Sequence, residues 1–311
     1  MRILVMGSGG LGGYFGGLLG RAGEDVVFVA RGAHLDAIAA QGLRVGSPDG
    51  DFALRARAVA RPADAGTVDL VLFAVKTYDE AAAALAIRPA VGPKTAVLCL
   101  QNGVETEDRL AAVLGRAPVL GGVTYVSASI ESPGVIRHSG LPGTIVFGEL
   151  DGRVTPRVEA IAAMLRHAGI RAEAVTDIVG VLWEKFVFIC AVGGMTATTR
   201  VTLGEVWDQP ESHDMLRALM EETAAVGRAR GMRLDGVVER QMALVEQLVS
   251  GADYHTRASL YHDLAAGKRM ELDALCGAVV RMGRDAGIST PFSAAVVAVL
   301  RPHERRAAAR R

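Results

Sequence analysis

Residues 2–12 read Arg-Ile-Leu-Val-Met-Gly-Ser-Gly-Gly-Leu-Gly, a short apolar run that ends in glycines at positions 7, 9 and 12. This GxGxxG spacing after an apolar run is typical of a β-strand that turns tightly into a helix. Backbone amides at the start of such a helix can bind a pyrophosphate, because glycines let the ligand approach the main chain. The same pattern also occurs in turns that serve packing alone, so its context has to distinguish the two interpretations.

The sequence after the glycines favours nucleotide binding. Tyr14 to Arg21 is predicted to be helical, and a second apolar run, Val26 to Ala30, follows at the distance expected for a strand–helix–strand unit. We therefore predict a dinucleotide-binding turn with cofactor contacts from Gly7, Ser8, Gly9, Gly10, Leu11 and Gly12.

The residue after the second predicted strand indicates which nicotinamide cofactor is used. NAD enzymes usually have Asp or Glu there, which binds the ribose 2′-hydroxyl, whereas this chain has Arg31. A guanidinium can bind a 2′-phosphate through two hydrogen bonds, while a carboxylate would repel it. The alternative is an ordinary exposed arginine at a strand end. We predict NADPH/NADP⁺ as the cofactor.

The composition is that of a globular protein. The chain has 311 residues, enough for about two domains, and half of them are hydrophobic while 22% are charged. Because 34 Lys and Arg balance 34 Asp and Glu, no overall positive charge points to a nucleic-acid partner. The Arg-rich stretch 301–311 is predicted to be a solvated, frayed tail.

We expect a cytoplasmic protein with no membrane partner. The first apolar stretch is interrupted by glycines at once, unlike a signal peptide, and no uninterrupted apolar run reaches the roughly 18 residues of a membrane span. The cysteines at positions 99, 190 and 276 lack the spacing of a metal site and fit a reducing compartment. We also expect a homodimer and no metal.

Strand and helix signals divide the chain into two domains. The first part predicts a helix over 34–41, a hairpin over 43–59, strands over 69–75 and 96–100, short strands over 119–130 and 134–148, a helix over 155–167 and a strand over 170–175. Apolar spacings of three and four then predict helices over 181–195, 215–230, 235–250 and 270–285. We predict a Rossmann-type, doubly wound α/β domain over 1–177 and an all-helical domain over 178–311.

Polar residues follow two of the predicted strands. Lys76 follows the strand that ends at Val75, and Asn102 lies just beyond the strand that ends at Leu100. Ligands of open α/β sheets bind at the carboxyl ends of strands, so this cation and this amide are candidates for contact with a cofactor or substrate. The alternatives are a surface lysine and a plain Asn-Gly turn.

The second domain offers three further candidates. Lys185 interrupts an apolar helix, which suits either a partly desolvated proton donor or a lysine whose ammonium reaches solvent at the edge of the helix. Ser259 and Glu271 are separated by a glycine-containing break, so we predict them on two neighbouring helices that can bring a hydroxyl and a carboxylate to one cleft.

Several motifs together resemble the ketopantoate reductase (2-dehydropantoate 2-reductase) family. They are the glycine turn, the segment 30–38, Val75-Lys76-Thr77, Gln101-Asn102-Gly103, Trp183-Glu184-Lys185, Met195-Thr196-Ala197 and the segment 259–271. The resemblance extends over essentially the whole chain in the same order. It implies a Rossmann domain, a helical domain similar to that of 6-phosphogluconate dehydrogenase, and NADPH-dependent reduction of a 2-oxo acid, as in pantothenate biosynthesis.

The resemblance also implies roles for single residues. Lys185 matches the family's general acid, and Glu271 matches its acidic partner, which we also expect to contact the cofactor. Ser259 matches the contact to the substrate carboxylate, while Asn102 and Lys76 match polar residues beside the nicotinamide and substrate. These types suit the chemistry, because hydride addition to a C2 ketone builds negative charge on oxygen, which a proton donor must neutralise.

Two positions depart from the family pattern. The family usually has asparagines four and eight residues after the catalytic lysine, where this chain has Ile189 and Gly193. The first asparagine contacts the substrate in the family, so Ile189 is expected to line the substrate site and to favour a more apolar 2-oxo acid than 2-dehydropantoate. A further alternative is an NADPH-binding sensor with little activity. The joint retention of Lys185, Glu271, Ser259 and Asn102 argues against a sensor, whereas Ile189 argues mildly for it.

Overall fold

The computed structural model describes residues 1–309, apart from the side chains of Leu141 and Pro142. The chain divides into two compact units. Unit 1 contains Met1–Gln101 and Glu105–Val179, and unit 2 contains Asn102–Val104 and the chain from Gly180 onward. The division thus falls close to residue 177, but the short segment after Gln101 belongs to unit 2 rather than to the first domain.

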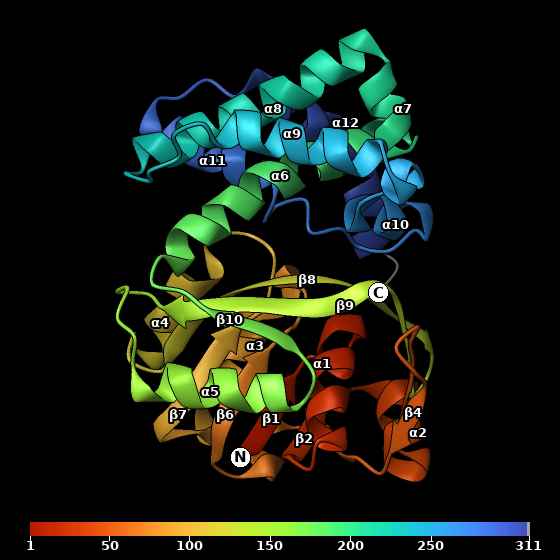
Figure 1. Cartoon of the computed structure of the whole chain (residues 1–311), viewed down its shortest axis with the longest axis vertical. Coiled ribbons are helices and arrows are strands. Elements are labelled where there is room, and N and C mark those ends of the chain that lie inside the picture. The colour runs from red at the N-terminus through yellow and green to blue at the C-terminus, as the bar shows by residue number, and fades with distance from the viewer. Residues whose placement is uncertain (310–311) are drawn as a thin grey trace. The chain divides into compact units, whose positions relative to one another are not determined.

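Unit 1 is a mixed sheet with helices on both faces (Figure 1). Its strands are β1 (Arg2–Met6), β2 (Asp25–Val29), β3 (Leu43–Gly46), β4 (Phe52–Leu54), β5 (Arg57–Val59), β6 (Val68–Phe73), β7 (Val91–Cys99), β8 (Val119–Ser132), β9 (Val135–Glu149) and β10 (Arg171–Ala174). Parallel neighbours run in the order β5-β2-β1-β6-β7-β8, the order of a doubly wound dinucleotide-binding fold. The predicted fold class is confirmed.

The helices of unit 1 bury both faces of the central strands. They are α1 (Gly10–Arg21), α2 (Gly32–Gln41), α3 (Glu80–Ile87), α4 (Thr106–Leu114) and α5 (Pro156–His167). Along β1, Ile3 and Val5 join the core that contains residues of α1 and α5, while Leu4 and Met6 join the core that contains residues of α3 and α4. This burial on both faces explains why the central strands read as continuous apolar runs.

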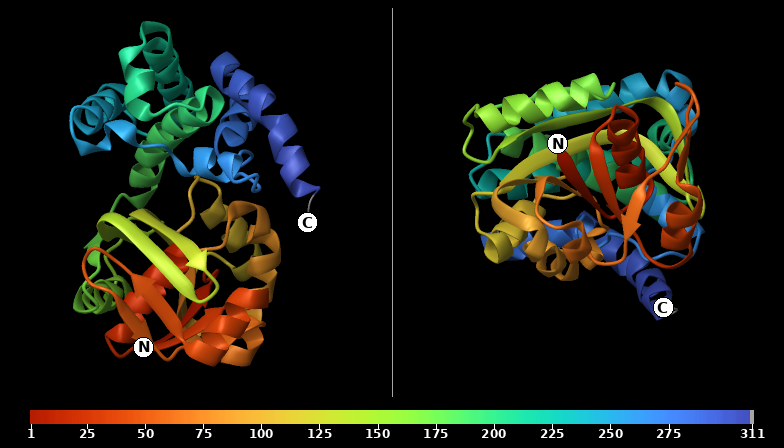
Figure 2. Two further views of the ribbon diagram at one scale, coloured as in Figure 1. Left: turned by 90° about the vertical axis from the view of Figure 1, so that its right-hand side faces the viewer. Right: turned by 90° about the horizontal axis from the view of Figure 1, so that it is seen from below.

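The two edge strands of the sheet are consecutive in the chain, which requires a strongly curved sheet. β4 and β5 lie at opposite ends of the strand order, although only residues 55 and 56 separate them. β8 and β9 form a long hairpin whose far end pairs with β3, so the sheet bends around α1 (Figure 2). The hairpin predicted over 43–59 is therefore correct for β3 and β4 and wrong for β5, which pairs in parallel with β2.

Helix α1 begins at Gly10, earlier than the predicted start at Tyr14. Six of its 12 residues are glycine, which lowers intrinsic helix propensity. Close packing compensates, because a Cβ on Gly16 would lie 2.7 Å from side-chain atoms of both Phe28 and Val5. The helix is therefore set by its contacts with the surrounding strands.

Unit 2 is helical. Its helices are α6 (Ile178–Thr199), α7 (Leu203–Asp208), α8 (Pro210–Ala229), α9 (Val237–Val249), α10 (Ser259–Ala265), α11 (Cys276–Ala286) and α12 (Pro291–Ala308). The helix predicted over 270–285 begins only at Cys276, because Leu275 has φ −104° and ψ −111°. The prediction of a frayed tail over 301–311 is wrong for residues 301–308, which belong to helix α12. Residues 310–311 lie outside the described part of the chain.

Candidate active site

The glycine turn between β1 and α1 has the geometry of a nucleotide-binding turn. Gly7 has φ +100°, and a Cβ on it would lie 2.6 Å from the Val75 nitrogen. A Cβ on Gly12 would lie 2.2 Å from the Gly7 carbonyl oxygen, so both positions require glycine. A Cβ on Gly9 would meet nothing within 4 Å, which leaves the main chain there open to a ligand. These features fit the close approach of a dinucleotide.

The start of α1 supplies backbone donors. Gly9 caps the helix without a side-chain hydrogen bond, and the first amides of a helix have no partner within it. The amides of Gly10, Leu11 and Gly12 therefore suit a pyrophosphate. Ser8 differs from the prediction in one respect, because its buried hydroxyl donates to the Val29 carbonyl at 2.9 Å and so holds the turn against β2.

His34 supports the same turn, a role that sequence analysis missed. Its Nε2 lies 2.8 Å from the Ser8 carbonyl oxygen, and its Nδ1 accepts from the Gly134 amide at 3.0 Å. These partners define a neutral ring that donates through Nε2. Burial lowers the pKa of His34, which favours the neutral form of the ring.

Arg31 lies at the end of β2, as predicted, with 71% of its side chain exposed. The Asp79 carboxylate is 3.9 Å from its guanidinium. Asp79 closes the short 3₁₀ turn Thr77–Asp79, which directly follows the half-buried Lys76 after β6. No sequence pattern connects Arg31 with Asp79, because their proximity depends on how the ends of β2 and β6 are arranged in the sheet.

Helix α6 carries Lys185 on its less buried side. Lys185 and Ile189 are half-buried, whereas residues 186, 187, 190 and 191 are buried. The two positions lie one helical turn apart, so they share a face. Although Lys185 is partly accessible, desolvation lowers its pKa to about 8, and the negative charge of Glu271 opposes this decrease.

Glu271 is buried in the turn between α10 and α11, not on a helix as predicted. It is the only charge that acts appreciably on the pKa of Lys185 among the described residues. The structure therefore brings the predicted proton donor and its predicted acidic partner together within unit 2. A buried carboxylate close to a half-buried ammonium group favours the charged form of that ammonium group.

Asn102 and Ser259 adjoin different segments of unit 2. Next to Asn102, Gly103 has φ +112°, and a Cβ on it would lie 3.3 Å from the Ala274 carbonyl oxygen. The Asn-Gly turn therefore adjoins the turn that carries Glu271. Ser259 is exposed at the start of α10, next to Leu260, whose Cβ would lie 3.8 Å from a Cβ on Gly193. About 12 Å of helix axis separates Gly193 from Lys185.

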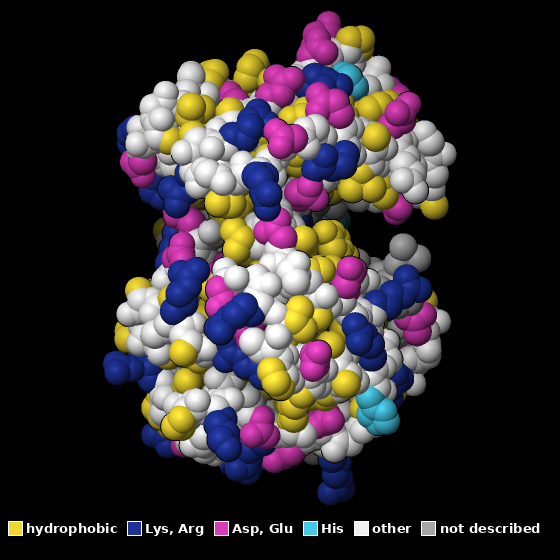
Figure 3. Space-filling view, turned by 60° about the vertical axis from the view of Figure 1, so that its left-hand side comes forward, with side chains coloured by type: hydrophobic (Ala, Val, Ile, Leu, Met, Phe, Trp, Pro, Cys, Tyr) yellow, Lys and Arg dark blue, Asp and Glu magenta, His cyan; other side chains and the backbone are white. Residues whose placement is uncertain are grey.

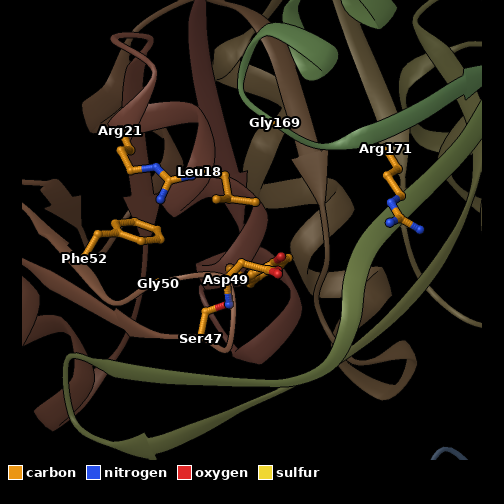
Figure 4. A pocket seen from close by; sticks show the side chains of 9 residues that line it. Leu18, Arg21, Ser47, Asp49, Gly50, Phe52, Gly169 and Arg171 are labelled. Carbon is orange, nitrogen blue, oxygen red and sulfur yellow. The ribbon is translucent and has the colours of Figure 1, made fainter.

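A separate pocket of about 210 Å³ lies in unit 1 at the far end of α1 from the glycine turn (Figure 4). It lies between Arg21 at the end of α1, the β3–β4 turn and Arg171 at the start of β10. The Arg21 guanidinium lies 4.4 Å from the centroid of the Phe52 ring and is therefore engaged within the protein. This pocket is distinct from the predicted cofactor-binding turn.

Models of two protein-family domains match the chain. The model described as "Ketopantoate reductase PanE/ApbA" matches residues 3–152, and "Ketopantoate reductase PanE/ApbA C terminal" matches residues 177–304. Among curated relatives, the 2-dehydropantoate 2-reductase of Archaeoglobus fulgidus is 36% identical over 301 residues, which cover 96% of this chain and 97% of the relative. The 2-dehydropantoate 2-reductase of Mesorhizobium japonicum is 32% identical over 323 residues, with 97% of each chain covered.

Solved structures show the same architecture. The PanE/ApbA family ketopantoate reductase from Ralstonia eutropha JMP134 has a TM-score of 0.89 and 35% identity, covering 99% of this chain and 100% of that one. A D-mandelate dehydrogenase solved with NADH and anilino(oxo)acetate has a TM-score of 0.90 at 23% identity, covers 99% of both chains, and shares the fold. The matches to both family models and to full-length relatives show that the chain belongs to the ketopantoate reductase family of oxidoreductases.

Proposed function

We propose that this protein uses NADPH to reduce a 2-oxo acid to the 2-hydroxy acid, with the conversion of 2-dehydropantoate to (R)-pantoate as the first candidate reaction. The observation that carries the proposal is the pairing of Lys185 with the buried Glu271 in a chain of the ketopantoate reductase family. It disfavours a sensor without turnover, since binding alone does not require a lysine with a pKa near the working pH.

The residues divide the chemistry between them. Bound NADPH supplies a hydride to the carbonyl carbon. The Lys185 ammonium donates its proton to the carbonyl oxygen, on which negative charge builds during hydride addition. A pKa of about 8 leaves Lys185 protonated at neutral pH and makes it a stronger acid than an ordinary lysine. Glu271 keeps Lys185 charged, and Ser259 and Asn102 contact the substrate.

The cofactor contacts come from unit 1. The amides of Gly10, Leu11 and Gly12 would hold the pyrophosphate, and Arg31 would bind the 2′-phosphate. Lys76 would contact the nicotinamide or the substrate. Glu271 is a further proposed contact to the cofactor.

Ile189 supports a second candidate, the reduction of a more apolar 2-oxo acid. Its half-buried side chain lies one turn from Lys185 and offers only methyl and methylene groups. A substrate hydroxyl placed against it would lose a hydrogen bond with water and gain none. Gly193 has no side chain that could form a hydrogen bond. A Cβ at this position would make ordinary van der Waals contact with the Leu260 Cβ at 3.8 Å.

We further propose a cytoplasmic homodimer that acts on a small molecule, without a nucleic-acid or membrane partner. Acidic and basic side chains are interspersed on the face in Figure 3, which does not favour nucleic acid. One described helix, α6, is long and apolar enough to span a membrane, but 61% of its most apolar window is buried within the protein, as in the core helix of a soluble protein.

A substrate panel tests the proposal. The purified protein is mixed with NADPH and with 2-dehydropantoate, its analogue lacking the hydroxyl, or simple aliphatic 2-oxo acids, and the loss of NADPH absorbance is followed. We expect turnover that depends on the 2-oxo acid and is lost in Lys185→Ala. NADPH binding without turnover on any member of the panel would favour the sensor instead.

A further inference from the structure

The turn that carries Glu271 is held by side chains of α12. The Glu304 carboxylate is buried, and its Oε2 accepts a hydrogen bond from the Met270 amide at 2.6 Å. Its Oε1 accepts from Arg269 Nε at 3.1 Å. Glu304 therefore binds the two residues that directly precede Glu271, one of them through the main chain.

The other side of the turn is held by a second residue of the same helix. Arg301 donates two hydrogen bonds to the Asp273 carboxylate, at 2.5 and 3.1 Å. These bonds hold the pKa of Asp273 below its usual value, so it stays charged and paired. Arg301 and Glu304 are three residues apart, so they lie on one face of α12. Together they bind residues on both sides of Glu271.

Helix α12 is itself fixed at its start. The Glu222 carboxylate of α8 accepts from the amides of Phe292 and Ser293, both at 2.8 Å, and from the Ser293 hydroxyl at 2.6 Å. The helix also packs on α6, because a Cβ on Gly194 would lie 3.3 Å from both methyl groups of Val296. The element that holds the Glu271 turn therefore also contacts the helix that carries Lys185.

We propose that Glu304 and Arg301 are positioning residues, which set the location of Glu271 relative to Lys185. The inference rests on the proposed function only in that Lys185 acts as the proton donor. The positioning role itself does not depend on that function. If the hydrogen bond from the Met270 amide to Glu304 is lost, the turn can shift, and the Glu271 carboxylate can move away from the Lys185 ammonium group. Nothing else in the active-site assignment gives a role to these two residues.

The direct test measures the Lys185 pKa in the cofactor-free protein. The chain has four lysines, at positions 76, 94, 185 and 268, so the ¹³Cε signals of labelled lysine are few and Lys185→Met assigns its signal. The charged groups around the turn are Arg269, Asp273, Arg281, Arg301 and Glu304. Glu304→Ala is expected to lower the Lys185 pKa by about half a pH unit or more. The reason is that the negative charge of Glu271, which raises this pKa, would move away from Lys185.

Conservative and control variants separate positioning from folding. Glu304→Gln retains an acceptor for the Met270 amide and is expected to give a smaller shift. Arg301→Gln releases only the Asp273 side of the turn. If Glu304→Ala does not fold, Arg301→Gln replaces it as the test variant. Arg305→Ala alters the next, exposed part of α12 and is expected to leave the Lys185 pKa and kcat unchanged.

The positioning role and the proposed function can fail separately, and the experiments distinguish the two failures. If folded Glu304→Ala and Arg301→Gln both titrate at Lys185 as the wild type does, these residues only stabilise the fold and the positioning role is wrong. If the wild type reduces no 2-oxo acid, the proposed function fails, while the lysine titration still reports whether α12 sets the Glu271–Lys185 contact. We expect kcat of Glu304→Ala to fall about tenfold with little change in KM.

Discussion

The Asp79 carboxylate lies 3.9 Å from the guanidinium of Arg31, at the position where we place the 2′-phosphate of NADPH. The pair is accessible to solvent, since the Arg31 side chain is 71% exposed and the Asp79 side chain is 30% exposed. An exposed pair of this kind is weak, so a phosphate with two negative charges can compete for the guanidinium. Asp79 nevertheless places a negative charge where an NADPH-specific site needs positive charge.

Cofactor preference follows from this pair. NADPH is expected to bind about tenfold to a hundredfold more tightly than NADH, since a charge-assisted contact to phosphate contributes about 1.5–3 kcal/mol. Arg31→Ala should remove most of this preference, whereas Asp79→Asn should raise NADPH affinity about two- to fivefold and leave NADH nearly unchanged. Titration of both cofactors by nucleotide fluorescence measures these affinities. Equal affinity of the wild type for the two cofactors contradicts the assignment.

Loss of the proton donor should affect turnover rather than cofactor binding. Lys185→Ala is expected to lower kcat by a factor on the order of 10² to 10⁴, as for other general acids, with nearly normal NADPH affinity. Lys94→Ala, which removes an exposed lysine of β7, is the matched control. Steady-state kinetics decide the question, and a Lys185→Ala variant with near-normal kcat returns this lysine to a structural role.

The pH dependence of the rate has a defined sign. Reduction needs protonated Lys185, so its rate should fall as pH rises through a pKa of about 8, while oxidation of the 2-hydroxy acid should increase over the same interval. Glu271→Gln removes the charge that raises this pKa. The descending limb of the pH–rate profile, where the reduction rate falls, should therefore move to lower pH by about one unit. Glu184→Gln, which releases Arg240 on α9, should leave the limb in place. A limb that stays near pH 8 in Glu271→Gln is incompatible with this pairing.

Substrate choice should depend on Ile189. Placing a substrate hydroxyl without a partner costs about 1–3 kcal/mol, which is about five- to a hundred-and-fifty-fold in kcat/KM. Aliphatic 2-oxo acids should therefore equal or exceed 2-dehydropantoate as substrates, and Ile189→Asn should shift the preference toward 2-dehydropantoate. Comparison of kcat/KM for 2-dehydropantoate and its analogue without the hydroxyl tests this. A strong wild-type preference for 2-dehydropantoate means that another residue supplies the hydrogen bond.

Stability should respond to a buried acid in unit 1. Burial raises the pKa of Glu107 on α4 to about 8, so the folded state holds a proton that the unfolded chain releases above its ordinary pKa of 4.5. Stability contributed by this group is therefore lost as pH rises between these values. Glu107→Gln should raise Tm by about 3 °C or more at pH 8 and by less than about 1 °C at pH 5. The exposed Asp108→Asn is the control, and equal Tm changes at both pH values argue against a protonated Glu107.

Local sequence patterns predicted the frame of this protein. The apolar run and glycines of residues 2–12 predict the strand, turn and helix, because these features depend on neighbours within a few residues. The change from strand to helix periodicity near residue 177 predicts a domain boundary there, and unit 1 of the structure ends at Val179. Motifs in the right order also identified the family, and the resemblance predicts the roles of Lys185 and Glu271.

Arrangements that depend on distant packing could not be predicted in this way. The crossing of β5 to β2, the contact of Asp79 with Arg31, and the bond from Met270 to Glu304, 34 residues away, all join segments that carry no mutual signal in the sequence. Glu271 lies in a turn rather than on the helix that its apolar neighbours predict, because Leu275 interrupts the helical conformation and α12 holds the preceding residues. Periodicity records which face of an element is buried, whereas the partner that buries it is set only when all the elements pack together.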